Sequence, residues 1–279
     1  MTSHHQSRTT SPHAYLPPII RHAVDWYYHC LHPYIHVENE YQLNTLPEPV
    51  IFAANHNTSF ETVILALYLL HRRDGKKVSF LVDWMYQYLP IVGWLMKHID
   101  AIYGYNKPST ISFINRFRKS PETQKVTLVC IRYLRDRRNV VIFPEGTRNT
   151  HPYQLKRGRK GIGDIVLQTG VPVIPIGIDF PSRMMRGKIP RFGRIIFRFG
   201  SIMDFRTAIQ SYCQKTAHEA LCRHEQRKLY HQTISDITHK IMNEIAVLSG
   251  KCFSYATAQQ SPQNELIKNT TEEKLIWYG

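Results

Sequence analysis

The stretch from residue 139 to residue 179 constrains the fold most, because it holds two apolar runs with a helical pattern between them. The run NVVI is rich in β-branched residues and is followed by Pro144, which predicts a buried strand. The segment GIGDIVLQTG is typical of a helix that ends at Gly170, since glycine is common just beyond helix C-termini. The segment VPVIPIGID predicts a second apolar strand. A strand, a helix and a strand in this order indicate right-handed crossover units around a buried, mainly parallel sheet.

The flanking segments extend the same architecture. Strands are predicted at Val50–Ala54, Val78–Val82 and Ile195–Phe199, and a buried helix is predicted at Thr62–Leu70. Further helices are expected at residues 112–119 and 126–138, and residues 215–249 are expected to form one or two helices that stop at Gly250. We therefore expect one α/β domain from residue 16 to residue 250, with helices on both sides of a mainly parallel central sheet and C-terminal helices completing it.

Both ends of the chain are polar. We expect residues 1–15 to be disordered and residues 251–279 to form a flexible tail. Residues 16–36 mix aromatic, basic and proline residues with a rough helical stripe of apolar side chains. This segment is expected to form an N-terminal helical cap, which either packs on the core or lies in a lipid interface.

The net charge of +15 comes from 36 Lys and Arg against 21 Asp and Glu, and it predicts an anionic partner. Nucleic acid fits poorly, because the sequence has no helix-turn-helix, zinc or base-stacking module. No apolar run reaches the roughly 18 to 20 residues of a spanning helix, so any membrane contact is expected at the surface. The five scattered cysteines form no CxxC pair, which favours a reducing compartment over a disulfide framework or a zinc site.

A histidine and an acid follow the first predicted strand. In FAANHNTSFE, His56 comes two residues after the apolar run and Glu61 comes five residues later. Ligand crevices of α/β proteins open at the carboxyl ends of strands, so His56 is a candidate general base. Glu61 can orient the imidazole if it lies in the first turn of the next helix. It also fits a capping box with Thr58, and both roles are compatible because a carboxylate has two oxygens.

A second candidate cluster, FPEGTRN, follows the strand that begins at residue 139. Gly146 permits a tight turn, so we expect Glu145 and Arg148 to face the same crevice, with Thr147 adding a hydroxyl. Arg148 offers a planar fork of donors suited to phosphate oxygens. Taken alone, residues 145–148 are as typical of a turn with a Glu–Arg surface pair as of a binding site.

Two basic segments come next. LKRGRKGIG places Lys156, Arg157 and two further cations among glycines before a helix, which suits either an anion site or an ordinary solvated loop. Residues 181–199 contain six Lys and Arg and no acid, and this segment either faces solvent or contacts an anionic bilayer.

Taken in order, these blocks resemble the glycerolipid acyltransferase family, whose best-known members are the 1-acylglycerol-3-phosphate acyltransferases. The resemblance runs over about residues 45–180 through NHNTSFE, FPEGTR, LKRG and VPVIPIGI. The histidine block alone is weakly specific. The block FPEGTR at residues 143–148, after the histidine block and before the basic loop and the final strand, is strongly specific.

The resemblance implies that His56 is the general base and that Glu61 orients it. The family's histidine takes the proton from an acceptor hydroxyl, which attacks the thioester of acyl-CoA or acyl carrier protein. This chemistry needs no metal, no cofactor beyond that co-substrate and no covalent acyl-enzyme. The family's phosphate-binding block, with the neighbouring cations, corresponds here to Glu145, Gly146, Thr147, Arg148, Lys156 and Arg157.

The implied reaction is acylation of lysophosphatidate to phosphatidate, by a peripheral enzyme on the cytoplasmic face of a membrane that contains anionic lipid. Two departures leave the acceptor open, because both remove positive charge: Asp83 stands where a lysine is often found, and YNKP at residues 105–108 lacks the arginine of a further family block. A third departure, Glu61 in place of the family's usual aspartate, changes the reach of the acid toward His56. Another lysophospholipid or lipid acceptor, or a catalytically silent lipid-binding relative, is the alternative.

Overall fold

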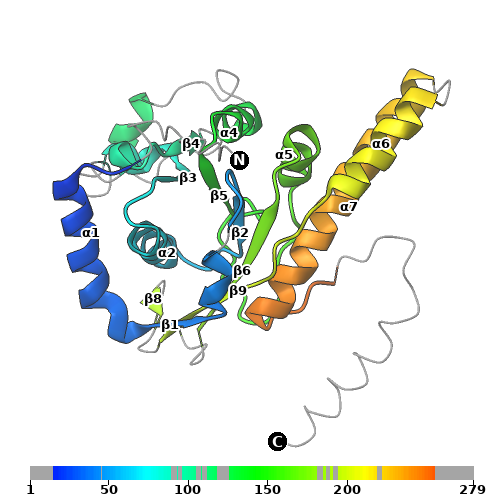
Figure 1. The fold of residues 1–279 in the computed structure, drawn as a ribbon. Coiled ribbons are helices and arrows are strands. Elements are labelled where there is room, and N and C mark those ends of the chain that lie inside the picture. The colour runs from blue at the N-terminus through cyan, green and yellow to red at the C-terminus, as the bar shows by residue number, and fades with distance from the viewer. Residues whose placement is uncertain are drawn as a thin grey trace, which may run out of the picture.

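The structure, a computed structural model, describes residues 15–44, 46–88, 93, 96–104, 108, 112–117, 126–180, 185–186, 189–190, 194–218 and 222–254. These residues form a seven-stranded sheet with helices on both faces (Figure 1). In spatial order the strands are β1 (Ile35–Glu38), β9 (Ile195–Phe199), β6 (Val173–Asp179), β2 (Ile51–Ala54), β5 (Asn139–Ile142), β3 (Val78–Asp83) and β4 (Ile102–Gly104). The five strands from β6 to β4 are parallel, and β9 and β1 run in the opposite direction. The expected mainly parallel α/β sheet is confirmed.

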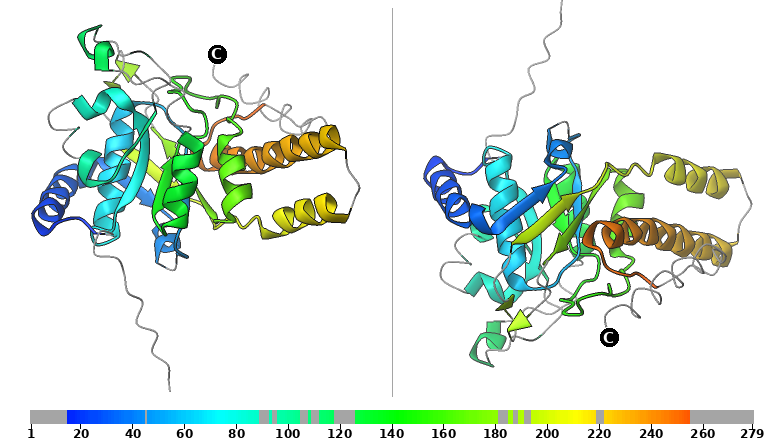
Figure 2. Two further views of the ribbon diagram at one scale, coloured as in Figure 1. Left: turned by 90° about the horizontal axis from the view of Figure 1, so that it is seen from above. Right: turned by 90° about the horizontal axis from the view of Figure 1, so that it is seen from below.

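Two helical layers cover this sheet. The helices α1 (Pro18–Leu31) and α2 (Ser59–Arg72) lie on one side, and α4 (Val126–Arg135), α5 (Gly161–Thr169) and α7 (Arg223–Ser249) lie on the other (Figure 1). The helix α6 (Arg206–His218) runs beside α7, and the two extend beyond the sheet as a pair (Figure 2). Short 3-10 helices occur at His32–Tyr34, Glu40–Leu43, Trp84–Tyr88 and Ser112–Phe117, and β7 (Met185–Arg186) pairs with β8 (Ile189–Pro190).

The strand β2 is buried on both faces. Phe52 and Ala54 belong to the core on the α1 and α2 side, whereas Ile51 and Ala53 belong to the core on the side of α4, α5 and α7. Successive side chains of a strand alternate between faces, and a parallel strand covered on both faces needs apolar residues at every position. This is why the sequence of β2 is a continuous apolar run rather than an alternating one.

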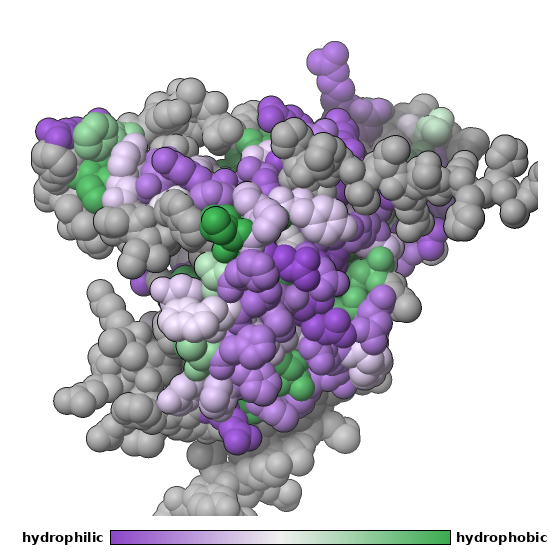
Figure 3. All heavy atoms as spheres, turned by 60° about the vertical axis from the view of Figure 1, so that its left-hand side comes forward, coloured by the Kyte–Doolittle hydropathy of each residue, from purple (hydrophilic) through white to green (hydrophobic). Residues whose placement is uncertain are grey.

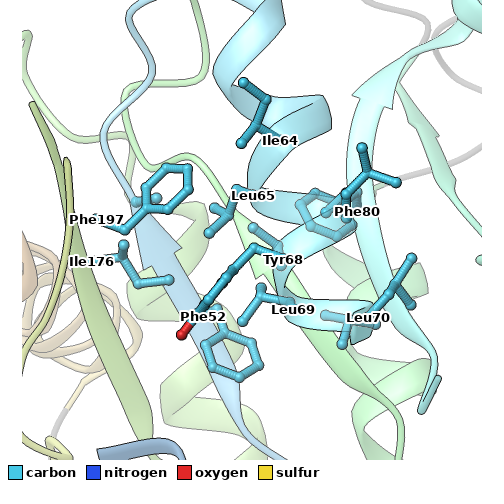
Figure 4. Packing of buried hydrophobic residues seen from close by; sticks show 14 of the residues in the cluster. Phe52, Ile64, Leu65, Tyr68, Leu69, Leu70, Phe80, Ile176 and Phe197 are labelled. Carbon is cyan, nitrogen blue, oxygen red and sulfur yellow. The ribbon is translucent and has the colours of Figure 1, made fainter. Parts of the chain in front are cut away.

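The helix α2 packs the largest group of side chains against the sheet. Leu65, Tyr68 and Leu69 point toward Phe52 and Phe197, which lie on β2 and β9 (Figure 4). Burying one such side chain contributes about 1.5 to 3 kcal/mol, so the packing of α2 exceeds any single polar contact at its start. The core therefore determines where the first turn of α2 lies, and that turn carries Glu61.

The helix α7 is held against α5 by a close approach of two backbones. A Cβ atom at Gly163 would lie 2.0 Å from the carbonyl oxygen of Ile234, so no larger residue fits there without moving α7. The hydroxyl of Tyr230 also donates to the carboxylate of Asp164 on α5. The helix ends at Gly250, whose φ of +64° is the left-handed conformation that favours glycine at this position.

Several expected boundaries were wrong. Residues 35–38 form β1, which was not expected, and the helical region expected at 215–249 consists of α6, beginning at residue 206, and α7. Residues 112–117 form a short 3-10 helix. Packing also continues past residue 250, because Lys251 is buried and Cys252 pairs with Gln154.

The described helices include none that combines the length and apolarity needed to cross a bilayer.

Candidate active site

The carboxyl ends of two neighbouring parallel strands carry the candidate residues. In β2 and β5, Ile51 is paired with Val140 and Ala53 with Ile142. This register places the loop after β2 directly beside the turn after β5. Two backbone contacts then join the loops: the N–H of His56 donates to Glu145 Oε1 at 3.1 Å, and the N–H of Asn149 donates to the carbonyl of His56 at 2.7 Å.

His56 and Glu61 face one another across the start of α2. Nδ1 of His56 lies 3.4 Å from Oε1 of Glu61. This separation is longer than a good hydrogen bond, and contacts of this kind commonly shorten when substrate binds. The imidazole also packs on the ring of Phe143, with centroids 4.5 Å apart. The expected geometry, a loop histidine beside an acid in the first helical turn, is what the structure has.

The same carboxylate oxygen also caps the helix. Oε1 of Glu61 accepts the N–H of Thr58 at 2.8 Å and the N–H of Asn57. The two roles were expected to use different oxygens, and this was wrong, because all three contacts converge on Oε1. Among the described residues, Oε2 is buried without a hydrogen-bond partner.

Burial raises the pKa of the Glu61 carboxyl, because a side chain with no solvent exposure loses the hydration that favours its charged form. The contact with His56 and the two backbone N–H groups act in the opposite direction and favour the carboxylate. The acid next to the histidine is therefore a group whose charge depends closely on its few donors.

The loop between the histidine and the acid is fixed by two asparagines. Oδ1 of Asn55 accepts the N–H of Ile178 at 2.7 Å, and its Nδ2 donates to the carbonyl of Ile178 at 2.9 Å. Nδ2 of Asn57 donates to the same carbonyl at 3.3 Å. Both side chains thus attach the loop to the end of β6, the neighbouring strand.

A buried lysine connects this loop to the one after β5. Nζ of Lys251 donates to Oδ1 of Asn57 and, at 3.0 Å, to the carbonyl of His151. Its exposed fraction is only 9%, and burying an ammonium group is costly unless it is hydrogen-bonded. Sequence reasoning missed Lys251 because it lies in the segment expected to be a flexible tail, and no local pattern marks it.

Glu145 has a different role from the expected one. Its exposed fraction is 2%, and it does not line the cavity beside His56. Oε1 accepts the N–H of His56, while Oε2 accepts from Asn149 Nδ2 at 2.7 Å and from the N–H of Lys156 at 2.8 Å. The expectation that Glu145 faces the crevice was wrong, because its carboxylate is used to join three loop segments.

A cavity of about 620 Å³ lies at the carboxyl ends of β2, β3 and β5. His56 lines it, together with Gly146, Thr147 and Arg148 from the turn after β5. Most of the remaining wall is apolar, and a cavity with an apolar wall and a few convergent polar groups is typical of a ligand site. Its apolar lining includes Val63, Leu81, Met96, Ile142, Ile162 and Ile165.

The cations of the expected anion site divide into two groups. Lys156 and Arg157 are exposed and do not line the cavity, and Lys156 Nζ instead donates to the carbonyl of Arg148 at 2.7 Å. Arg159, two residues farther on, lines the cavity beside Arg148. Of the cations in this segment, Arg159 rather than Lys156 or Arg157 is therefore placed to reach a molecule in the cavity.

The path of Arg159 depends on the glycine of the turn. Gly146 has a φ of +63°, and a Cβ atom there would lie 2.4 Å from both Cδ and Nε of Arg159. The absence of a side chain at residue 146 therefore lets the guanidinium cross the turn. Asp83 also lines the cavity, whereas residues 105–107, where the missing arginine was noted, lie outside the described residues.

Comparison with known proteins gives distant relatives. An uncharacterized acyltransferase of Schizosaccharomyces pombe is 28% identical over 147 residues, which are 51% of this chain and 46% of that protein. The chloroplastic 1-acyl-sn-glycerol-3-phosphate acyltransferase LPAT1 of Arabidopsis thaliana is 26% identical over 196 residues, 70% of this chain and 48% of that one. A chloroplastic enzyme of the same description from Brassica napus is 26% identical over 191 residues, 67% of this chain and 48% of that one. This chain spans about half the length of these relatives.

Among solved structures, the 1-acyl-sn-glycerophosphate acyltransferase PlsC from Thermotoga maritima matches 80% of this chain and 78% of its own, with a TM-score of 0.47 and 16% identity. The family model described as Acyltransferase matches residues 34–179, which include β1 to β6 and the whole candidate site. That range is more than half of the 279 residues. The protein is therefore a member of the Acyltransferase family.

Proposed function

We propose that this protein transfers a fatty acyl group from acyl-CoA or acyl carrier protein to the free hydroxyl of lysophosphatidate. The observation that carries the proposal is His56, which lines the cavity while its Nδ1 lies 3.4 Å from the buried Glu61. A histidine held in this way presents Nε2 to a bound substrate as a general base. The two chloroplastic relatives are named for the same reaction.

The chemical step needs only groups that the site supplies. The acceptor oxygen attacks the thioester carbonyl carbon as Nε2 of His56 takes its proton. The carbon–sulfur bond then breaks, and the thiolate leaves with that proton from the imidazolium. The carboxylate of Glu61 stabilises the imidazolium during this exchange, as the acid does in other histidine-based sites.

Two arginines support a phosphate-bearing acceptor. Arg148 and Arg159 both line the cavity that holds His56. Guanidinium groups bind phosphate oxygens through paired, charge-assisted hydrogen bonds. The apolar remainder of the cavity suits the acyl chain of a lipid or of the thioester.

One observation favours a second acceptor class. Asp83 lines the same cavity, and a carboxylate there opposes a second negative group on the substrate. A lysolipid whose headgroup also carries a positive charge, such as an amine, would meet Asp83 favourably. Another lysophospholipid is therefore the second candidate, with the same base and the same donor chemistry.

We also propose that the enzyme works as a peripheral protein at the cytoplasmic face of a membrane containing anionic lipid. The exposed side of α1 carries Ile19, Trp26 and Tyr27, with exposed fractions of 78%, 64% and 47%. Amphipathic aromatic rings favour the boundary between lipid and water. The face turned forward in Figure 3, on which α1 lies, is largely hydrophilic with small separate hydrophobic patches, which suits surface contact rather than deep insertion.

Arg198, one of the six cations of residues 181–199, forms ion pairs within the protein. Arg198 forms salt bridges with Glu38 at 2.8 Å and with Asp179 at 3.2 Å, so its charge is balanced within the protein. The expectation that all six cations of residues 181–199 could face a bilayer was wrong for Arg198. Residues 181–184, 187–188 and 191–193 lie outside the described residues.

An acceptor panel tests the proposed function. Purified protein is given one acyl-CoA with an equimolar mixture of lysophosphatidate, lysophosphatidylcholine, lysophosphatidylethanolamine and lysophosphatidylglycerol, and mass spectrometry identifies the products. Phosphatidate as the main product supports the first candidate, and acylation of a cationic headgroup lipid supports the second. Liposome binding without any acylated product, from acyl-CoA or acyl carrier protein, would contradict both.

A further inference from the structure

A second cavity, of about 380 Å³, lies between the start of α5 and the amino-terminal half of α7. Its lining is basic and contains no acidic residue. The set consists of Lys160, His224, Arg227, Lys228, His231, Gln232 and Ser235. None of these residues has a part in the chemistry at His56.

The cations of this cavity converge because of helical spacing. On α7, His224, Arg227, Lys228 and His231 are related by intervals of three and four residues, so they lie on one face of the helix. Lys160, at the start of α5, supplies the opposite wall. Gly163 holds α5 and α7 close together, which fixes the distance between the two walls.

The acids beside this face all have other hydrogen-bond partners, and Asp236 accepts from Gln232 Nε2 at 3.3 Å. Asp164 accepts from Gln168 Nε2 at 2.6 Å and from the hydroxyl of Tyr230. Glu225 accepts the N–H of Cys222 at 2.8 Å and so caps α7, although its charge also interacts with Lys228. Within the described part of the chain, Lys160, Arg227 and Lys228 form no salt bridge. The lining carries three cations and no acid, and the single charge of Glu225 offsets only part of them, which suits an anionic ligand.

The basic cavity and the cavity that contains His56 are lined by one common segment of the chain. Arg159 and Gly161 line the larger cavity, and Lys160 between them lines the basic one. Consecutive residues at the start of α5 therefore line both cavities. A long molecule can place its reactive group near His56 and its anionic end at the basic cavity.

We propose that the basic cavity binds the phosphates at the nucleotide end of coenzyme A, which makes acyl-CoA the acyl donor. The inference rests on the proposed acyl transfer and adds the identity and position of the donor. Coenzyme A carries a diphosphate and a separate monophosphate, and Arg and Lys are the side chains best suited to such groups. Cations from two helices that converge on one concave site fit a compact polyanion better than the broad surface of an acidic carrier protein.

Calorimetric titration with coenzyme A tests this binding without any turnover. The full chain is titrated with coenzyme A and with pantetheine, which has the thiol arm but no phosphates. The double variant Arg227→Ser, Lys228→Ser removes two cations from the cavity. The matched control Arg223→Ser, Lys240→Ser removes two exposed cations of α7 that do not line it. Thermal unfolding establishes that both variants are folded.

We expect coenzyme A to bind at least about tenfold more weakly to the cavity variant, because charged hydrogen bonds to phosphate are lost. The control variant should bind coenzyme A as the unaltered protein does, and pantetheine should bind weakly to all three. Equal affinity of both double variants for coenzyme A, or equal binding of pantetheine and coenzyme A, would overturn the proposal.

Two further outcomes separate this inference from the proposed function. Coenzyme A should bind normally to His56→Ala, so loss of acyl transfer in that variant leaves the donor site in place. If coenzyme A does not bind, while the cavity variant loses transfer from acyl carrier protein alone, the cavity docks the carrier protein and the inference is overturned. Phosphate-dependent binding at the cavity in a protein that acylates no lysolipid would support the donor site and contradict the proposed acceptor reaction.

Discussion

One oxygen atom of Glu61 caps α2 and, in the proposed reaction, orients the base. Oε1 accepts two backbone N–H groups at the start of α2 and lies beside Nδ1 of His56. The carboxylate has no exposed surface, so its charge exists only because these donors offset the lost hydration. Glu61, the residue proposed to orient the base, therefore lowers the stability of the folded state when it is ionised.

The substitution Glu61→Gln should change how stability depends on pH. Burial raises the folded-state pKa of Glu61, so its favourable contribution is complete below the unfolded-state pKa of about 4.3 and is lost as the pH rises through the folded-state value. Glutamine does not ionise. We therefore expect the free energy of unfolding of the unaltered protein to fall relative to that of Glu61→Gln as the pH rises above the unfolded-state pKa. Urea denaturation at several pH values measures this, and parallel profiles would contradict it.

The substitution Gly146→Ala should impair the acceptor site more than the fold. Both Gly146 and Gly170 have positive φ, so alanine at either costs about 1 to 2 kcal/mol of backbone strain. Only at residue 146 would the new Cβ meet Arg159, because a Cβ at Gly170 has nothing within 4 Å. We expect Gly146→Ala to raise KM for a phosphate-bearing acceptor about tenfold, the effect of losing a charged hydrogen bond. If Gly170→Ala raises that KM equally, Arg159 has no special role.

At the scale of elements, loops from distant parts of the chain form the site. The loops after β2 and β5 are joined by Glu145, and the segment after α7 joins them again through Lys251. The strands determine where these loops begin, and the buried polar side chains determine how they face one another. The site is thus a product of sheet register and of a few hydrogen-bonded groups behind it.

The substitution Lys251→Met tests the second of these connections. It removes the donor to Asn57 and His151 while keeping an unbranched side chain of similar length. Asn57 Oδ1 would keep only the 3.3 Å contact with Asn55 Nδ2, and a buried acceptor that loses its donor costs about 1 to 3 kcal/mol, so the loop between His56 and Glu61 should shift. Steady-state kinetics well below the unfolding temperature should show a lower kcat with little change in KM for the acyl donor.

Lys240→Met is the matched control for that experiment, because Lys240 is an exposed lysine of α7. We expect it to leave kcat unchanged. A Lys251→Met protein that is folded and has the kcat of the control would show that Lys251 does not position the histidine loop. Arginine at residue 251 should restore part of the activity, since it keeps the buried donor charge.

The sequence was informative wherever a local pattern decides the structure. The continuous apolar runs of β2, β5 and β6 and the glycines at 170 and 250 predicted strands and helix ends correctly. It was uninformative where tertiary packing decides. The strand β1 alternates polar residues at an edge, Glu145 turns inward to three donors, and Lys251 reaches a partner 194 residues away. A local sequence pattern does not determine which way such a side chain points.

At the scale of the whole molecule, α1 and the pair of α6 and α7 lie on opposite sides of the sheet (Figure 2). The exposed aromatic side of α1 is the proposed membrane contact, and the basic face of α7 is the proposed donor site. The cavity with His56 opens at the carboxyl ends of the strands between these helices. In the proposed reaction, this arrangement would bring the lipid acceptor and the acyl-CoA donor to His56 from different directions.

The double variant Ile19→Ser, Trp26→Ser should weaken binding to membranes. Ile19 and Trp26 are exposed on α1, so the substitutions remove apolar contact with lipid and little core packing. Co-sedimentation with vesicles of phosphatidylcholine and phosphatidylserine measures the bound fraction, which we expect to fall several-fold. The control Val247→Ser changes a side chain with the same 78% exposure as Ile19, on α7 instead, and should bind as before. Equal binding by all three proteins would place the membrane contact elsewhere.

The most direct test of the proposed chemistry is the release of free coenzyme A by His56→Ala in the presence of acyl-CoA and lysophosphatidate. A general base contributes about 10² to 10⁴ to the rate, so we expect kcat/KM to fall at least about a hundredfold while coenzyme A binding and thermal stability stay near those of the unaltered protein. A folded His56→Ala protein that turns over at the original rate would show that the imidazole beside Glu61 is not the base.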